Sequence, residues 1–529
     1  MKYITNPILP GFNPDPSILR VGDDYYIATS TFEWFPGVQI HHSKDLIHWK
    51  LVAHPLNRVS QLDMEGNPSS GGIWAPCLTY DKGTFYLIYT DVKSYGGIFK
   101  DTHNYLVTAT NICGEWSEPI YLNSSGFDPS LFHDEDGRKW LVNMTWDHRK
   151  GKNRFGGILL QEYSIEEKKL VGPVYNIFKG SELKVTEGPH LYKINGFYYL
   201  LTAEGGTGLR HAVTIARSKD LTGPYEIDPE NPMLTAWNDP TLTLQKAGHA
   251  DIVETQNGEW YMVHLGSRPL PTRGRSILGR ETCIQKVRWT EDGWLRLEAK
   301  GKKPLTRVPA PNLPEYPWEP EPIREDFDSE VLNIHFNTLR KPLTESTLSL
   351  KERPGYLRLK GRESISSHHQ QALVARRQQA FCYTASTCVE FEPESFKQMA
   401  GLTCFYSTEN FHYLYISHDE EKGKCLSILS CEKENFGYPL EMDICVEGLK
   451  RLYLRAKVDY DKLQFYYSKD ETNWEAIGPI LDASILSDEH AKGWGFTGAF
   501  VGICCQDLSG ECKHADFDWF EYKEREFEG

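Results

Sequence analysis

The chain repeats one local pattern five times in its first three hundred residues: a turn containing glycine, followed by a strand rich in aromatic and aliphatic residues. A turn and strand of this kind are typical of a β-hairpin. The first aromatic residues of the five strands are spaced 60, 55, 58 and 62 residues apart, at Tyr25, Phe85, Trp140, Tyr198 and Trp260. A repeat with such regular spacing indicates a β-propeller, in which each repeat forms one blade. We therefore predict five four-stranded blades over residues 1–305.

A second recurring segment supports this interpretation. Residues 43–49, 110–116 and 218–225 have similar sequences, each ending in Trp or Tyr, and we expect the same outer turn in three blades. The alternative is a set of unrelated hairpins in one large β-sandwich.

A short strand is also expected ahead of each hairpin, at residues 13–17, 73–77, 127–130, 187–190 and 248–251. If these are the innermost strands, their first residues point toward the central axis. Asp15 and Asp128 then occupy equivalent places, each directly before a proline, and Glu187 lies one residue earlier in its blade. An Asp before Pro often caps its own turn, but three carboxylates around one axis repel each other and raise at least one pKa. This arrangement favours a functional site.

The motifs around these carboxylates resemble those of glycoside hydrolase family 43, most closely its bacterial β-xylosidases. They read Asn-Pro-Asp-Pro-Ser, Ile-Trp-Ala-Pro, Gly-Phe-Asp-Pro-Ser and Thr-Glu-Gly-Pro-His, and further similarity occurs at residues 32–38, 278–281 and 496–502. The resemblance implies an inverting exo-glycosidase that releases xylose from the non-reducing ends of β-1,4-xylooligosaccharides, with α-L-arabinofuranosidase activity as a side activity.

The same resemblance implies roles for the three carboxylates. Asp15 corresponds to the general base that activates water, and Glu187 to the general acid that protonates the leaving oxygen. Asp128 corresponds to a third carboxylate that orients the acid and keeps it protonated. In inverting enzymes the base and the acid stand about 6.5–9.5 Å apart, which leaves room for the water.

Further residues are expected around the site. Arg280 resembles the arginine that binds sugar hydroxyls in this family, although it could instead form a surface ion pair. Phe32, Trp74 and Trp146 could form the apolar side of a xylose pocket or belong to the core. We expect no required cofactor. His249 lies where some relatives hold a histidine beside a divalent cation, so calcium in the channel is a second expectation, although calcium prefers a cage of oxygen ligands.

Seven prolines between residues 304 and 322 indicate an extended linker, assigned to residues 306–322. Beyond it, strands with alternating apolar residues predict a β-sandwich over residues 323–529, similar to the lectin-like C-terminal domain of the family. This domain could bind carbohydrate or close the active site. The loop 493–498 favours closure, with Phe496 as the expected contact and Trp494 as the alternative.

Composition limits the partners. A net charge of −15 argues against nucleic acid or an anionic membrane as a partner. The first residues do not resemble a signal peptide, and the 12 cysteines form no zinc-binding pattern, so we expect free thiols and a cytoplasmic enzyme. We expect a homo-oligomer, a dimer or a tetramer.

The rival functions are an α-L-arabinofuranosidase or arabinanase on the same fold, and a sugar-binding propeller without catalysis. A retaining fructosidase is disfavoured because no Arg-Asp-Pro occurs.

Overall fold

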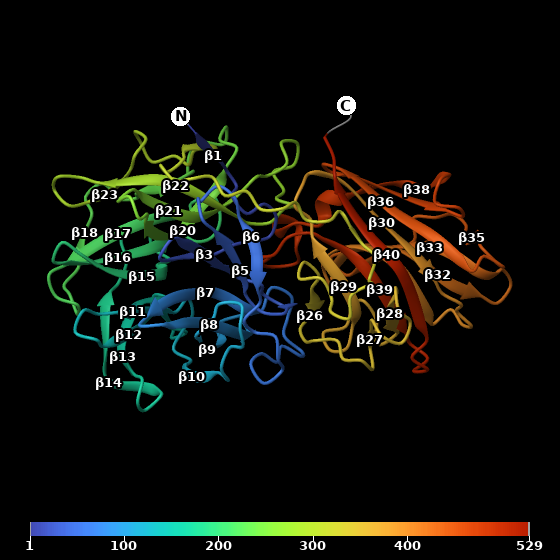
Figure 1. The fold of residues 1–529 in the computed structure, drawn as a ribbon, viewed down its shortest axis with the longest axis horizontal. Coiled ribbons are helices and arrows are strands. Elements are labelled where there is room, and N and C mark those ends of the chain that lie inside the picture. The colour runs from blue at the N-terminus through green and yellow to red at the C-terminus, as the bar shows by residue number, and fades with distance from the viewer. Residues whose placement is uncertain (1, 527–529) are drawn as a thin grey trace. The chain divides into compact units, whose positions relative to one another are not determined.

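The computed structural model describes residues 2–526, which divide into two compact units (Figure 1). The first unit comprises the chain up to Arg268 together with Arg280–Trp318, and the second comprises Pro269–Gly279 and the chain from Glu319 onward. The segment Pro269–Gly279 lies in the sequence between two strands of the last blade, and no sequence pattern indicated that it belongs with the second unit.

The first unit contains five antiparallel sheets in chain order, which confirms the predicted five-bladed propeller. The first blade contains β2 (Ser17–Val21), β3 (Asp24–Thr29), β5 (Gln39–Ser43) and β6 (Lys50–Ala53), and the second contains β7 (Gly72–Asp81), β8 (Thr84–Ser94), β9 (Asp101–Ala109) and β10 (Ile120–Asn123). The third contains β11 (Ser130–His133), β12 (Lys139–Trp146), β13 (Phe155–Ser164) and β14 (Lys169–Phe178), and the fourth contains β15 (Glu187–Ile194), β16 (Phe197–Glu204), β17 (Ala212–Ser218) and β18 (Glu226–Ile227), with β19 (Leu234–Thr235) beside β17. The fifth contains β20 (Gln245–Glu254), β21 (Trp260–Ser267), β22 (Glu281–Trp289) and β23 (Leu295–Leu297). The short strand β4 (Trp34–Phe35) lies outside these sheets.

The first strand of each blade is the innermost one. Each contacts the first strands of two other blades, in the order β2, β7, β11, β15, β20 and back to β2, so the five strands form a closed ring. Apolar side chains fill the spaces between blades. Ile27 of β3 and Val263 of β21, for example, belong to one buried cluster that joins the first blade to the last. This packing holds the five inner strands around one axis.

The N-terminal segment closes the propeller against its last blade. Strand β1 (Tyr3–Thr5) pairs with β24 (Arg307–Pro309). The next residue, Asn6, is buried, donates from Nδ2 to the carbonyl oxygens of Ile284 and Leu305, and accepts from the amide of Ile284 at Oδ1, over 2.7–2.8 Å. The two ends of the propeller sequence are therefore joined by strand pairing and by one buried amide side chain.

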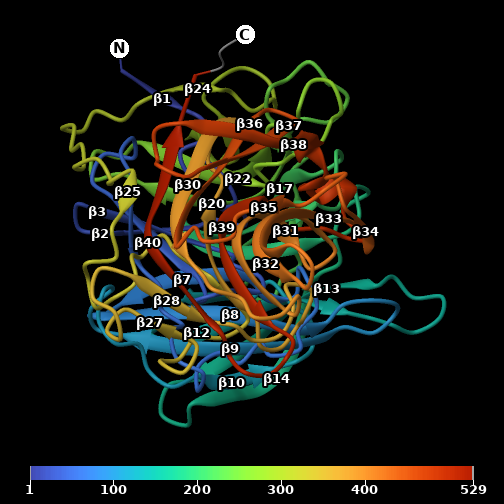
Figure 2. The same ribbon diagram turned by 90° about the vertical axis from the view of Figure 1, so that its right-hand side faces the viewer.

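The second unit is a β-sandwich, as predicted, and many of its strands are labelled in Figure 2. One sheet contains β27 (Leu348–Ser349), β28 (Leu357–Lys360), β40 (His514–Glu524), β30 (Cys382–Glu390), β36 (Arg451–Asp459), β37 (Lys462–Ser468) and β38 (Trp474–Asp482), with β25 (Arg324–Glu325) beside β40. The other contains β29 (Ala372–Arg377), β39 (Phe500–Asp507), β31 (Gln398–Ser407), β32 (Asn410–Asp419), β33 (Gly423–Glu432) and β34 (Asn435–Gly437), with β35 (Ile444–Cys445) beside β33. The short strand β26 (Thr338–Leu339) also lies in this unit, and a single apolar cluster fills the space between the two sheets.

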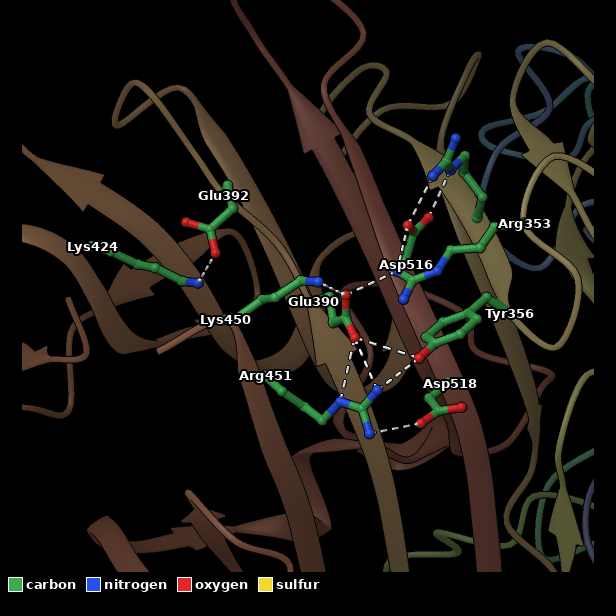
Figure 3. A network of polar contacts seen from close by, with 10 residues as sticks. Arg353, Tyr356, Glu390, Glu392, Lys424, Lys450, Arg451, Asp516 and Asp518 are labelled. Carbon is green, nitrogen blue, oxygen red and sulfur yellow. Dashed lines mark hydrogen bonds and ion pairs between the residues drawn. The ribbon is translucent and has the colours of Figure 1, made fainter. Parts of the chain in front are cut away.

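A network of charged side chains connects neighbouring strands of the first of these sheets (Figure 3). Arg353 contacts both Glu390 of β30 and Asp516 of β40, and Arg451 of β36 contacts Glu390 and Asp518. Glu390 and Asp516 are mostly buried, so these pairs are less screened by water than ordinary surface pairs. The network reinforces the register of these strands.

Helices make up little of the structure in the described residues. Within residues 2–526 the helical structure consists of two 3-10 turns, η1 (Ala483–Ile485) and η2 (Asp488–His490). In this part of the chain, none of the helices is long or apolar enough to span a bilayer.

Candidate active site

Five equivalent positions, on the inner strands or two residues ahead of them, share a positive φ angle. Asp15, Ala75, Asp128, Gly188 and His249 have φ values of 54°, 34°, 54°, 56° and 50°. The left-handed region costs an ordinary residue roughly 1–2 kcal/mol. Near three of these positions the register between the first and second strands of the blade also shifts, at Trp74–Cys77, Glu187–His190 and Gly248–Ala250. Bulges of this kind redirect side chains and often occur beside active sites.

Asp15 is held as a carboxylate by partners in two blades. Ser30 donates to Oδ2 at 2.7 Å, Arg280 donates from Nη1 to Oδ1 at 3.2 Å, and His249 Nδ1 lies 3.7 Å from Oδ1. Burial by itself would raise the pKa of this carboxyl. The charge of Arg280, the proximity of His249 and the Ser30 hydrogen bond outweigh burial, so the pKa lies below its usual value. Asp15 is therefore ionised at neutral pH.

Glu187 has the opposite character. Burial, and then repulsion from Asp15, raise its pKa to about 8, although Arg280 and Lys100 act to lower it. The side chain remains partly exposed, so it can reach a ligand from solvent. Glu187 is therefore protonated at neutral pH and can donate a proton.

Asp128 lies beside Glu187 and accepts a hydrogen bond from the amide of Gly188 at 3.0 Å. Burial, and then repulsion from Glu187 and Asp15, raise the pKa of Asp128 well above its usual value. Both Asp128 and Glu187 therefore have raised pKa values, and this end of the site retains protons that Asp15 does not hold.

Four aromatic side chains form a row of neighbouring rings beside the carboxylates. The ring centroids of Phe32 and Trp74 are 6.1 Å apart, those of Trp74 and Phe127 are 5.4 Å apart, and those of Phe127 and Trp146 are 6.4 Å apart. Lys100 lies over this row, with Nζ 4.6 Å from the centre of the Trp146 ring. The sequence-predicted residues Phe32, Trp74 and Trp146 are thus brought together, and Phe127 joins them.

Arg280 directly precedes β22 and is buried, which excludes the surface ion pair considered above. Its Nη1 contacts both Asp15 and the hydroxyl of Thr207 at 3.3 Å, and its guanidinium lies 5.5 Å from the centre of the Phe32 ring. The site thus combines charged, hydroxyl and aromatic groups, which suits a ligand rich in hydroxyls.

Several residues of the site were not identified from the sequence. They are Ser30, Lys100, Thr207 and His211. All four lie in segments that connect the strands of a blade, where no repeated motif marks a position. His211 is buried, its Nδ1 lies 2.8 Å from the carbonyl oxygen of Gly206, and burial and the proximity of His249 lower its pKa to about 3.

His249 was the residue expected beside a divalent cation. Burial lowers its pKa to about 4, so the imidazole is neutral, and its ring lies over Gly188. Among residues 2–526, no group of three His, Cys, Asp or Glu side chains is arranged to hold a metal ion. Calcium takes six to eight oxygen ligands, and the protein groups around His249 do not supply such a set. The structure gives the calcium expectation no support.

Phe496 and Trp494 lie in the second unit, with ring centroids 6.3 Å apart. Trp494 is 71 % exposed. The role predicted for Phe496 in closing the active site stays a prediction.

Comparison with known proteins agrees with the sequence resemblance. Residues 4–295 match glycosyl hydrolases family 43, and residues 324–523 match the β-xylosidase C-terminal concanavalin A-like domain. The chain is 54 % identical to the β-xylosidase of Bacillus subtilis, over 99 % of this chain and 100 % of that protein. It is 52 % identical to the xylosidase/arabinosidase 43B of Humicola insolens, over 99 % and 98 %. The crystal structure of the xylan β-1,4-xylosidase from Bacillus halodurans superposes with a TM-score of 0.97 at 60 % identity, covering 98 % of this chain and 100 % of that one. The chain therefore belongs to glycoside hydrolase family 43.

Proposed function

We propose that this enzyme is an inverting exo-β-xylosidase that releases xylose from the non-reducing ends of β-1,4-xylooligosaccharides. The observation that carries the proposal is the opposite protonation of two carboxyls in one site. Asp15 has a lowered pKa, and Glu187 has a pKa raised to about 8. Such a pair is what general base and general acid catalysis require.

The proposed reaction uses each group in one role. Asp15 accepts a proton from a water molecule that attacks the anomeric carbon, while Glu187 donates its proton to the leaving glycosidic oxygen. The amide of Gly188 donates to Asp128 and holds its carboxyl beside the acid, where Asp128 orients Glu187. Arg280 and Thr207 bind sugar hydroxyls, and Phe32 and Trp74 contact the apolar side of the sugar ring.

The choice of xylose rests on relatives that share half or more of the sequence and are named β-xylosidases. A relative named xylosidase/arabinosidase supports α-L-arabinofuranosidase activity as a side activity, since the two sugars present similar hydroxyl groups. A binding propeller without catalysis is disfavoured because it would not require an ionised and a protonated carboxyl in one site.

Proton NMR of the first turnovers on xylobiose tests the mechanism. Inversion at a β-linkage predicts that α-xylose appears before mutarotation. Initial β-xylose would show a covalent intermediate instead and would exclude Asp15 as a base acting on water. A panel of nitrophenyl glycosides, assayed with and without a chelator, tests the sugar preference. We expect the highest kcat/KM on the β-xyloside, a lower value on the α-L-arabinofuranoside, and no effect of the chelator.

We further propose a cytoplasmic homo-oligomer, a dimer or a tetramer. The location is supported by the 12 cysteines, all of which are free thiols, since a reducing compartment keeps thiols in this state. Light scattering after size-exclusion chromatography measures the assembly, and a mass of 60.7 kDa would exclude it.

A further inference from the structure

Ser30 lies at the junction of the first two blades, directly after β3. It is fully buried, and its amide donates to the carbonyl oxygen of Pro14 at 3.2 Å. Its hydroxyl oxygen accepts from the amide of Ala75 at 2.7 Å and lies 2.7 Å from Oδ2 of Asp15. One small side chain thus connects the second blade to the carboxylate of the first.

The direction of the hydroxyl follows from its partners. A serine hydroxyl has a single hydrogen, and an ionised carboxylate can only accept. Because the amide of Ala75 must be the donor in its bond with Oγ, the hydroxyl hydrogen is left for Asp15 Oδ2. The other oxygen of Asp15, Oδ1, lies beside Arg280 and His249 of the fifth blade. Rotation of the carboxylate would break its contacts with both blades.

We propose that Ser30 is a positioning residue for the general base: its hydroxyl, oriented by the amide of Ala75, stabilises ionised Asp15 and sets the rotation of its carboxylate. This inference rests on the proposed function, in which Asp15 acts on water. Ser30 itself touches neither substrate nor water in the proposed reaction.

Ser17 provides a matched comparison. It lies two residues after Asp15, is also fully buried, accepts from the amide of Leu78 at 3.1 Å, and donates to Oδ2 of Asp251 at 3.0 Å. The two serines therefore form the same pair of bonds, from an amide of the second blade to a carboxylate, but only Ser30 reaches Asp15.

The test compares the pH dependence of kcat/KM in Ser30→Ala, Ser17→Ala and Asp15→Asn. We expect Ser30→Ala to lower kcat/KM about 10- to 100-fold, as expected for the loss of a hydrogen bond to a charged group. Without that donor the pKa of Asp15 rises, so the acidic limb of the profile moves to higher pH. The alkaline limb, which reports Glu187, stays in place. The loss of kcat/KM in Ser30→Ala is expected to be similar for substrates with good and with poor leaving groups, because the attacking water needs a base in both cases.

Ser17→Ala controls for the removal of a buried hydroxyl and leaves the acidic limb unchanged. Ser30→Thr keeps the hydroxyl and is expected to restore the limb, and it also serves if Ser30→Ala does not fold. An acidic limb that stays in place in Ser30→Ala, or that moves equally in Ser17→Ala, overturns the proposal. Asp15→Asn separates the two ideas: if it keeps its activity the proposed mechanism fails, whereas an inactive Asp15→Asn with an unshifted Ser30→Ala refutes only the role of Ser30.

Discussion

At the scale of single residues, three carboxyls within one small site differ in their affinity for a proton because their nearest neighbours differ. Both Asp15 and Glu187 are subject to burial, which raises the pKa, and to Arg280, which lowers it. Asp15 also accepts a hydrogen bond from Ser30 and lies beside His249, whereas Glu187 is repelled by the charge of Asp15. Lys100 contributes in the opposite sense, because its positive charge favours the ionised form of Glu187. Two predictions follow from these surroundings.

The first prediction concerns the proton donor. Glu187→Gln removes the proton that a poor leaving group needs, so kcat on xylobiose falls at least 100-fold. A nitrophenyl xyloside has a good leaving group and retains much more of its activity. Asp15→Asn is the comparison variant, because the loss of the base affects both substrates equally. Steady-state kinetics on the two substrates measures the difference, and equal losses in Glu187→Gln would contradict its role as the acid.

The second prediction concerns pH. Activity requires protonated Glu187, so kcat/KM falls as the pH rises through about 8. Lys100→Met removes a charge that lowers this pKa, so the alkaline limb moves to higher pH. The acidic limb serves as the internal control, because Lys100 is not among the groups that shift the pKa of Asp15. A downward shift of the alkaline limb would be inconsistent with this account.

The sequence was sufficient to predict that those candidate residues which recur at one position of a repeat would lie together. Asp15, Asp128 and Glu187 could be aligned with one another because each precedes or neighbours the same turn. Ser30, Thr207 and Lys100 could not be predicted, because they reach the site through loop conformation and contacts between blades. Neither a spacing nor a motif records those features.

At the scale of elements, the distorted starts of the inner strands determine which side chains meet. Gly188 combines two constraints, because its φ is 56° and a Cβ at this position would lie 3.0–3.2 Å from ring atoms of His249. Its amide also holds Asp128. The strand therefore requires glycine next to the proposed acid.

Gly188→Ala is expected to lower kcat/KM at least tenfold and to reduce stability by about 2 kcal/mol, from backbone strain and crowding against His249. Gly196→Ala is the control. This glycine lies in the turn after β15 with a φ of 78°, and a Cβ there would meet no other atom within 4 Å. Gly196→Ala should lose only about 1 kcal/mol, from strain alone, and keep its activity. Equal activity in the two variants, measured together with their thermal unfolding, would argue against a role for the contact with His249.

The loop 493–498 of the sandwich carries a separate prediction. If Phe496 contributes to substrate binding, Phe496→Ala raises KM for xylobiose with a smaller effect on kcat, because the contact stabilises bound substrate and transition state alike. Trp494→Ala is the comparison. Unchanged KM values in both variants would leave the second unit without a direct part in substrate binding.

At the scale of the whole molecule, the propeller depends on a join between distant parts of the sequence. Asn6 makes three hydrogen bonds to residues that lie about 280 to 300 positions later. Asn6→Ala removes the side-chain partners of the amide and the carbonyl oxygen of Ile284, whereas the carbonyl oxygen of Leu305 still accepts from Gln285 at 3.1 Å. The substitution is expected to destabilise the first unit by about 3 kcal/mol. The activity of the folded enzyme should be unchanged.

Urea unfolding followed by tryptophan fluorescence measures this effect. Asn257→Ala, which removes an exposed side-chain bond to the carbonyl oxygen of Asn312, is the control and should change stability by less than about 1 kcal/mol. If Asn6→Ala and Asn257→Ala have the same free energy of unfolding, the join at Asn6 does not limit the stability of the propeller. The repeat spacing predicted the blades, but it contained no information about this join, because the bonds of Asn6 depend on a single residue outside the repeat.

The five positive-φ positions, on the inner strands or just ahead of them, differ in which residues they can accept. Asp15, Ala75, Asp128 and His249 show that residues other than glycine can adopt this positive φ, so a blade in which no neighbour crowds the position can exchange its residue there without rebuilding the strand. The five copies of this position hold the proposed base, a spacer, a second carboxylate, an amide donor and an imidazole. Ala75 is the copy with the smallest side chain that still has a Cβ, which makes it the natural place to introduce new chemistry into this enzyme.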